Sequence, residues 1–259
     1  MAALEARAHA NLCDFTRWNG RLDPATVTLD EDGVVATANP DGFLTVRTAI
    51  RSGDVLPAAR WAAVVDEFFA ARGRTSCIHA RVGLDDDLTG ELLARGYREW
   101  STSPEMVCDH ALEPRDPPAG VTLRFARTPA DIAAYAQIAA EAFAHLHLPH
   151  EATIAAVDCP EQFLADDCVV SLAELDGVPV AGAQVLLFDG GRIGYVGWVS
   201  CRDDARGRGL GDTVTRAVTN EAFRRGADLV TLEASSFGEH TYARMGYREI
   251  YRYRMLIRL

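Results

Sequence analysis

The sequence of 259 residues predicts an α/β protein with a mixed sheet, divided into two domains. Strand-like segments alternate with amphipathic helical segments along the chain, and a strand, a glycine-rich loop, a helix and a strand follow one another between residues 195 and 236. A segment with three prolines, 113–120, interrupts this pattern. We therefore expect domains at 1–112 and 121–259, joined by a linker at 113–120.

The composition is typical of a globular protein with an acidic surface. Hydrophobic residues make up 48% of the chain and charged residues 24%. The formal net charge is −11, and all 26 basic residues are arginine. An acidic chain is not expected to bind nucleic acid or an anionic membrane, so any anion must be bound by locally concentrated arginines.

Three further features predict a cytoplasmic protein. Residues 1–7 mix charge into the positions where a secretory signal would be apolar, and no apolar run is long enough to cross a bilayer. The six cysteines are scattered without C-x-x-C spacing, so we expect reduced thiols. Neither this spacing nor any other cluster predicts a metal site.

Periodicity and turn residues predict the elements of both halves. In the first half we expect helices at 3–18, 57–71 and 88–94, and strands at 27–29, 34–37, 43–50, 76–82 and 97–108. In the second half we expect strands at 121–126, 168–175, 178–188, 192–200 and 228–236, a helix from Thr128 to about Ala144, and a helix from Leu210 to about Arg225.

The loop from Arg206 to Gly211 has the residues of a phosphate-binding turn. Its glycines let the backbone approach an anion, and the N–H groups that begin the following helix point toward the same place. A nucleotide-binding P-loop is excluded, because Asp212 and Thr213 follow where lysine and serine or threonine are needed. A dinucleotide-binding turn is excluded too, because the third glycine comes one residue early.

Two motifs instead resemble those of the GNAT superfamily of acyl-CoA N-acyltransferases. Arg206, Gly209 and Gly211 match its Arg/Gln-x-x-Gly-x-Gly/Ala signature, and Tyr242 with Gly246-Tyr247 matches the segment that follows the next strand. The order of elements in 121–259 is also similar to that of the family. The resemblance implies a GNAT fold and acetyl-CoA-dependent acetyl transfer to a primary amine of a small molecule or peptide.

The resemblance also implies roles for particular residues. Tyr242 would be the general acid that protonates the departing thiolate. Ser235 stands where the family usually has asparagine, which weakens one expected contact with the pantetheine arm. The cofactor would be bound by backbone and side-chain groups of Val199, Ser200, Cys201, Arg206, Gly207, Arg208, Gly209, Leu210, Gly211 and Ser235.

A short repeat suggests that the first half is a degenerate copy of the second. Gly96-Tyr97-Arg98-Glu99 is identical to residues 246–249, and each follows a short helix and a strand. Leu92 stands where Tyr242 stands, and Ser52-Gly53-Asp54 supplies no arginine–glycine loop. We therefore expect two tandem GNAT-like domains, of which 1–112 is a structural or substrate-shaping partner.

Several points stay open from the sequence alone. The general base is not assigned, with Glu141, Glu174 and Glu233 as unranked candidates. His145, His147 and His150 form a run that serves as substrate contacts or a base more readily than as a zinc site. A non-catalytic acyl-CoA-binding protein is the alternative function, and the acceptor amine and a homodimer remain undetermined.

Overall fold

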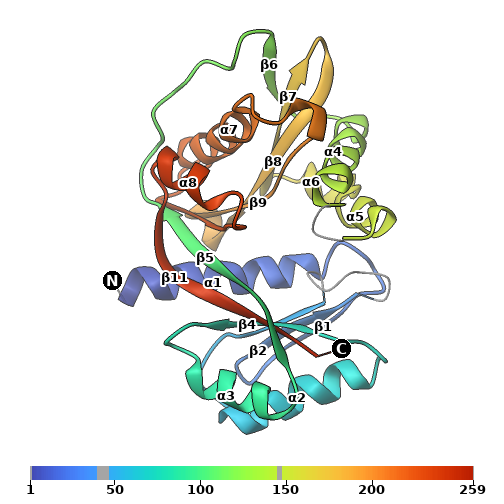
Figure 1. The fold of residues 1–259 in the computed structure, drawn as a ribbon, viewed down its shortest axis with the longest axis vertical. Coiled ribbons are helices and arrows are strands. Elements are labelled where there is room, and N and C mark those ends of the chain that lie inside the picture. The colour runs from blue at the N-terminus through green and yellow to red at the C-terminus, as the bar shows by residue number, and fades with distance from the viewer. Residues whose placement is uncertain (1, 40–46, 145–147, 259) are drawn as a thin grey trace. The chain divides into compact units, whose positions relative to one another are not determined.

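The computed structural model describes residues 2–39, 47–144 and 148–258, and its contacts divide the chain into two units. Unit 1 comprises Met1–Glu105, Glu233–Ser236 and Glu249–Leu259, and unit 2 comprises Met106–Leu232 and Phe237–Arg248. Each unit combines helices with strands of a mixed sheet (Figure 1). The final strand therefore has most of its contacts with the first half of the chain.

In its described residues, unit 1 has three α-helices and the strand order β1-β2-β3-β4-β11-β5. Strands β3 and β4 are parallel, whereas β1/β2, β2/β3 and β4/β11 are antiparallel. The predicted strand at 43–50 is described only from β3 onward, because residues 43–46 lie outside the described ranges. The elements are α1 (Ala2–Asn19), β1 (Val27–Glu31), β2 (Val34–Ala38), β3 (Thr48–Arg51), α2 (Ala58–Ala70), β4 (Cys77–Arg81), α3 (Asp86–Ala94), β5 (Arg98–Cys108) and β11 (Arg248–Ile257).

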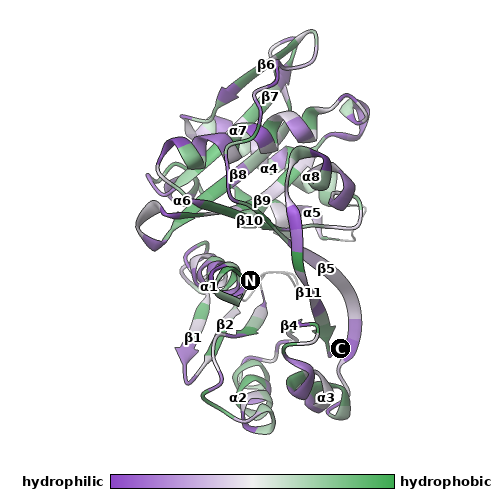
Figure 2. Cartoon of the chain, turned by 90° about the vertical axis from the view of Figure 1, so that its left-hand side faces the viewer, coloured by the Kyte–Doolittle hydropathy of each residue, from purple (hydrophilic) through white to green (hydrophobic). Residues whose placement is uncertain are grey.

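Unit 2 has the strand order β10-β9-β8-β7-β6. Strands β9 and β10 are parallel, and the other neighbours are antiparallel, so the sheet is mixed as expected. In Figure 2 hydrophobic residues concentrate on β8, β9 and β10. The elements are β6 (Val121–Phe125), α4 (Pro129–Phe143), α5 (His150–Val157), α6 (Pro160–Phe163), β7 (Cys168–Leu175), β8 (Val178–Phe188), η3 (Asp189–Gly191), β9 (Ile193–Cys201), η4 (Asp203–Ala205), α7 (Leu210–Arg224), β10 (Leu229–Glu233) and α8 (Glu239–Met245).

Helices α4 and α7 cover opposite faces of the β8–β9 pair. A Cβ at Gly182 would lie 2.5 Å from the ring of Tyr135 on α4, whereas a Cβ at Gly194 would lie 3.3 Å from Ala222 on α7. Gly182 and Gly194 therefore point to opposite faces of the sheet, and both helices pack closely because these two positions lack side chains. The two strands are thus buried on both faces.

The helix starts follow the residues that predict them. Thr128 accepts a hydrogen bond from the backbone N–H of Asp131, and the Asp131 carboxylate accepts one from the N–H of Thr128 in return. Pro129 occupies the first turn, where its missing N–H costs nothing. The start of α4 is therefore confirmed, and its end at Phe143 is one residue short of the expectation.

The repeat is confirmed in three dimensions. The N–H of Tyr97 bonds to the carbonyl of Leu92, and the N–H of Tyr247 bonds to that of Tyr242, both at 3.0 Å. The intervening glycines have φ of +87° and +119°, the left-handed conformation that ends a helix in this way. Leu92 is therefore the structural counterpart of Tyr242, as the sequence predicts.

The counterpart of the phosphate loop in unit 1 offers no anion site. Helix α2 begins after Pro57, which has no N–H to donate. Arg51, at the end of β3, is buried and forms ion pairs with Asp54 and Asp87. Arg51 thus stabilises the fold through these ion pairs instead of binding a ligand.

No helix of the described residues is long and apolar enough to cross a membrane. None of the six cysteines forms a disulfide. Four of them, among them Cys13 and Cys168, are buried, so they act as small apolar residues in the core.

Replacing Leu92 by alanine should lower the stability of the protein without a specific effect on turnover. Leu92 is fully buried in the core of unit 1 beside Trp61 and Leu88, and the loss of such a side chain typically costs about 2–5 kcal/mol. The neighbouring Leu93 is 49% exposed, so Leu93→Ala is the matched control and should change stability by less than about 1 kcal/mol. Chemical denaturation measures both, and equal effects would contradict the assigned core.

Candidate active site

The parallel pair β9/β10 separates part of the way along its length. Pairing covers Leu229–Thr231 against Ile193–Tyr195, but β9 continues to Cys201. The chain after β10 turns away, since the N–H of Ala234 bonds to the carbonyl of Pro104 on β5. The backbone of β9 from Val199 to Cys201 therefore lies beyond the pairing with β10, and an extended ligand can add to this edge like a strand.

A bulge distorts β9 at this point. Gly182 pairs with Ser200 and Gln184 with Gly197, so β9 has one extra residue relative to β8. Trp198, within the bulge, has φ of +52°, which is unfavourable for a side chain of this size. The hydroxyl of Tyr135 donates to the Trp198 carbonyl at 2.8 Å and holds the conformation.

Strained residues of this kind are common at functional sites. Trp198 was not predicted as one from the sequence, where it reads only as a strand residue. Gly197 was the available signal, because a glycine inside a strand often marks a bulge. Ser200, which was predicted to contact the cofactor, is buried here, and its hydroxyl has no hydrogen-bond partner among the described residues.

The loop between β9 and α7 exposes its backbone. Gly207 and Gly209 have φ of +76° and +78°, which explains why glycine is needed at both positions. A Cβ at Gly207 or Gly211 would meet no atom within 4 Å, and at Gly209 only Pro118 at 4.0 Å. The backbone of the loop and of the first turn of α7 therefore borders open space, where the N–H groups that begin a helix can bind an anion.

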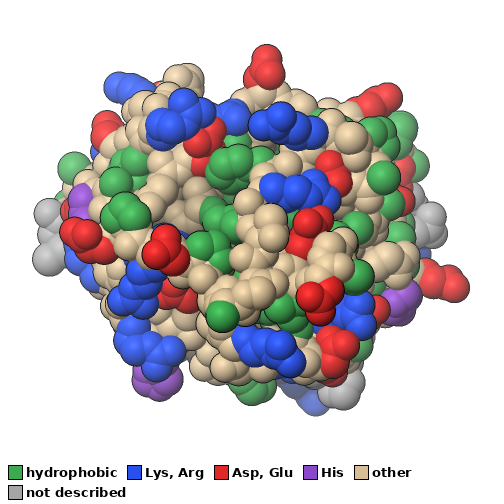
Figure 3. Space-filling view, turned by 90° about the horizontal axis from the view of Figure 1, so that it is seen from above, with side chains coloured by type: hydrophobic (Ala, Val, Ile, Leu, Met, Phe, Trp, Pro, Cys, Tyr) green, Lys and Arg blue, Asp and Glu red, His purple; other side chains and the backbone are tan. Residues whose placement is uncertain are grey.

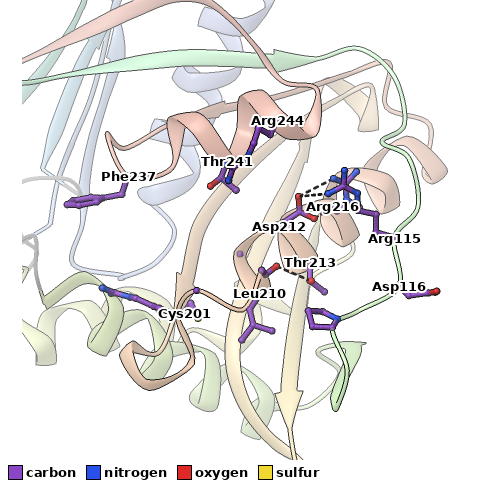
Figure 4. A pocket seen from close by; sticks show the side chains of 15 residues that line it. Arg115, Asp116, Cys201, Leu210, Asp212, Thr213, Arg216, Phe237, Thr241 and Arg244 are labelled. Carbon is purple, nitrogen blue, oxygen red and sulfur yellow. Dashed lines mark hydrogen bonds and ion pairs between the residues drawn. The ribbon is translucent and has the colours of Figure 1, made fainter.

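The loop borders a cavity of about 940 Å³ (Figure 4). Thr241 and Arg244 on α8 lie across from the start of α7, and Arg115, Asp116 and Pro118 close one side. Four arginines and two aspartates line the cavity. On the surface seen in Figure 3, basic and acidic side chains are interspersed. The lining residues are Arg115, Asp116, Pro118, Cys201, Arg206, Gly207, Gly209, Leu210, Gly211, Asp212, Thr213, Arg216, Phe237, Thr241 and Arg244.

The structure brings most of the predicted cofactor residues to this cavity. Cys201, Arg206 and four residues of the loop and helix start line it, namely Gly207, Gly209, Leu210 and Gly211. Val199, Ser200, Arg208 and Ser235 are not among the lining residues. Arg208 and Ser235 are exposed, and Val199 and Ser200 belong to the unpaired part of β9.

Arg206 is held by other groups of the loop and of α4. One of its nitrogens donates to the carbonyl of Ala142 at 3.2 Å and lies 2.8 Å from the carboxylate of Asp203. These contacts fasten the loop to the end of α4. Arg206 therefore positions the loop in addition to contributing charge to the cavity.

Tyr242 is partly buried and differs from two buried tyrosines of unit 2, Tyr135 and Tyr247. The hydroxyl of Tyr247 bonds to Thr219 and that of Tyr135 to Trp198, whereas Tyr242 forms no hydrogen bond through its hydroxyl within the described part of the chain. Burial raises the pKa of Tyr242 well above its ordinary value. The phenol is thus protonated at neutral pH and free to donate, although it is not among the cavity-lining residues.

The three glutamates considered as bases have different environments. Glu174 lies 2.8 Å from Arg124 across the β6–β7 pair, and Glu141 is 49% exposed and 3.7 Å from Arg202. Glu233 is mostly buried and lies 3.4 Å from His79 within unit 1. Glu174 is thus committed to an ion pair, whereas Glu233 has a partner that is charged only when protonated.

The histidine run is described only in part. His145 and His147 lie outside the described residues, and His150 is exposed at the start of α5. Among the residues that the structure describes, no group of three or more His, Cys, Asp or Glu side chains has the geometry of a metal site.

Comparison with known proteins identifies this part of the chain. The sequence model of the acetyltransferase (GNAT) family matches residues 132–247, which include the phosphate loop and Tyr242. Residues 132–247 form a GNAT acetyltransferase domain. The match supports an acyl-CoA-dependent acetyltransferase activity for this domain. A search of curated protein sequences returned no match.

Solved structures share the fold of the GNAT domain and of unit 1 together. A GCN5-related N-acetyltransferase from Kribbella flavida is 22% identical with a TM-score of 0.74, and the match covers 96% of this chain and 94% of that one. One from Sphaerobacter thermophilus is 19% identical, with a TM-score of 0.65 and coverage of 89% and 82%. A tandem GNAT protein from the clavulanic acid biosynthesis pathway is 16% identical, with a TM-score of 0.61 and coverage of 91% and 83%. The tandem GNAT fold is therefore confirmed.

Filling the cavity at Gly211 should weaken acetyl-CoA binding while the GNAT domain stays folded. Gly211 is helical without a positive φ, so Gly211→Val adds a side chain without backbone strain, unlike Gly209→Val. We expect the dissociation constant to rise about tenfold or more, a loss of roughly 1.4 kcal/mol. Calorimetric titration measures the change.

Gly90→Val is the matched control for this change. Gly90 also lies in a helix, has no atom within 4 Å of its Cβ position and is in unit 1. Gly90→Val should leave the affinity for acetyl-CoA unchanged. Unchanged affinity in Gly211→Val would mean that the cavity is not the phosphate site.

Proposed function

We propose that the protein transfers the acetyl group of acetyl-CoA to a primary amine by direct attack in a ternary complex. The observation that supports this most is the continuity of the site, because the unpaired edge of β9 ends at Cys201 and leads into the glycine loop. An extended arm followed by a diphosphate fits this arrangement. Acetyl-CoA supplies an activated acyl thioester when bound there.

Backbone groups do most of the binding in this proposal. The β9 edge from Val199 to Cys201 aligns the arm, and the N–H groups from Gly207 to Gly211 bind the diphosphate. Thr213 stabilises the helix start, since its N–H and its hydroxyl both donate to the Gly209 carbonyl at 3.0 and 3.1 Å. The loop is thereby arranged before ligand binding, which lowers the entropic cost of binding.

Tyr242 completes the chemistry as the general acid. Attack by the amine nitrogen forms a C–N bond and breaks the C–S bond, and the sulfur leaves with the electron pair. The phenol transfers its proton to that sulfur, the attacking nitrogen gives up a proton to water, and water returns a proton to the phenolate after the amide has formed. A protonated hydroxyl without a competing hydrogen-bond partner suits this role at neutral pH.

Release of free thiol from acetyl-CoA in the presence of a panel of amines tests the function. We expect release above the hydrolysis background for at least one primary amine, and mass spectrometry should show an added acetyl group on it. Tight acetyl-CoA binding without release for any amine would favour the alternative, a non-catalytic acyl-CoA-binding protein. Absence of binding at millimolar acetyl-CoA would contradict the proposal.

Tyr242→Phe should slow the chemical step and leave acetyl-CoA affinity nearly unchanged. The hydroxyl is needed only as charge develops on the leaving sulfur, and general acid catalysis typically contributes about 10²–10⁴-fold. A thiolate leaves readily, so we expect the lower end of this range. Single-turnover kinetics and calorimetry measure the two quantities separately.

Tyr247→Phe is the control for this variant. The Tyr247 hydroxyl bonds to Thr219 at 2.7 Å in the core, so its loss should lower stability by about 1 kcal/mol but spare the rate. Full single-turnover rate in Tyr242→Phe would show that this phenol is not the acid.

A further inference from the structure

The cavity beside the phosphate loop has two chemically different ends. Figure 4 shows Cys201 and Phe237 at one end, and Arg115, Arg216 and Asp212 at the other. The first end adjoins the free edge of β9, and the loop glycines lie between the two. A bound molecule that runs from β9 across the loop therefore reaches the arginine end.

The arginine end has more basic than acidic side chains, since Arg115, Arg216 and Arg244 line it together with Asp116 and Asp212. Arg216 holds Asp212 through two nitrogens at 3.1 and 3.2 Å, so this carboxylate already has a full partner. Arg115 is 64% exposed and contacts Asp212 only at 3.8 Å. Arg244 is exposed on α8 and has no ion pair with another described residue. Both guanidinium groups are thus available to an anion.

The segment that carries Arg115 is fastened to α7. Arg216 donates to the carbonyl of Glu113 at 2.9 Å, and the side chain of Asn220 bonds to both the N–H and the carbonyl of Leu112, at 2.7 and 3.0 Å. These contacts hold the start of the 113–120 segment against the helix whose first turn binds the diphosphate. Arg115 is therefore kept beside the cavity, so less entropy is lost when it binds a ligand.

We propose that Arg115 and Arg244 bind the 3′-phosphate on the ribose of acetyl-CoA, which makes the segment 113–120 part of the ligand site. The inference rests on the proposed function. With the arm on β9 and the diphosphate on the loop amides, the 3′-phosphate is the one anionic group of the ligand left to bind. Arginine pairs with phosphate through two parallel N–H groups, which adds both affinity and geometric selectivity.

Binding of acetyl-CoA and of acetyl-dephospho-CoA, which lacks only this phosphate, tests the inference on the full-length protein. The unaltered protein should bind acetyl-CoA about tenfold or more tightly, as expected for charge-assisted hydrogen bonds. Arg115→Gln and Arg244→Gln should each weaken acetyl-CoA binding and leave acetyl-dephospho-CoA binding unchanged. The double variant should bind the two ligands equally.

Arg127→Gln is the matched control, because Arg127 is exposed in unit 2, does not line the cavity and carries the same charge. It should retain the preference for acetyl-CoA. Equal affinities in the unaltered protein, or an equal loss for both ligands in Arg115→Gln and Arg244→Gln, would overturn the assignment. Failure to bind either ligand would instead contradict the proposed function, and this inference with it.

Discussion

The site depends on the separation of β9 from β10. Three residue pairs join the two parallel strands, and Val199–Cys201 of β9 lie beyond this pairing. An unpaired strand edge inside a protein is unfavourable unless a ligand or water satisfies it. The bulge at Trp198, held by Tyr135, directs this edge, and η4 connects its last residue to the glycine loop. The edge of β9, the bulge and the glycine loop thus form one continuous surface on which an extended anionic ligand can bind.

Much of this arrangement follows from local sequence rules. The loop was predictable because positive φ at Gly207 and Gly209 needs glycine and leaves the backbone accessible. The likeness of Leu92 and Tyr242 was predictable because Gly-Tyr ends both helices through the same hydrogen bond. Helix boundaries such as Thr128-Pro129 follow from capping chemistry. Each of these features depends on residues that are close in the chain.

Features that depend on distant contacts could not be predicted. The left-handed Trp198 needs Tyr135, which is far from it in sequence, and the placement of Arg115 needs Arg216 and Asn220 of α7. A proline-rich segment indicates a linker by composition, but its contacts are set by tertiary packing. The final strand pairs with β4 of the first half because sheet neighbours need not be neighbours in the chain. Tertiary structure therefore decides which arginines reach the cavity.

Amide hydrogen exchange with and without acetyl-CoA tests the central claim most directly, because it reports backbone hydrogen bonds residue by residue. The account predicts that ligand slows exchange at Val199–Cys201 and at Gly207–Asp212, with little change at the start of α2, where the equivalent loop of unit 1 lies. Slowed exchange elsewhere, with these two segments unaffected by bound acetyl-CoA, would contradict the assignment of the β9 edge and the glycine loop as the ligand site.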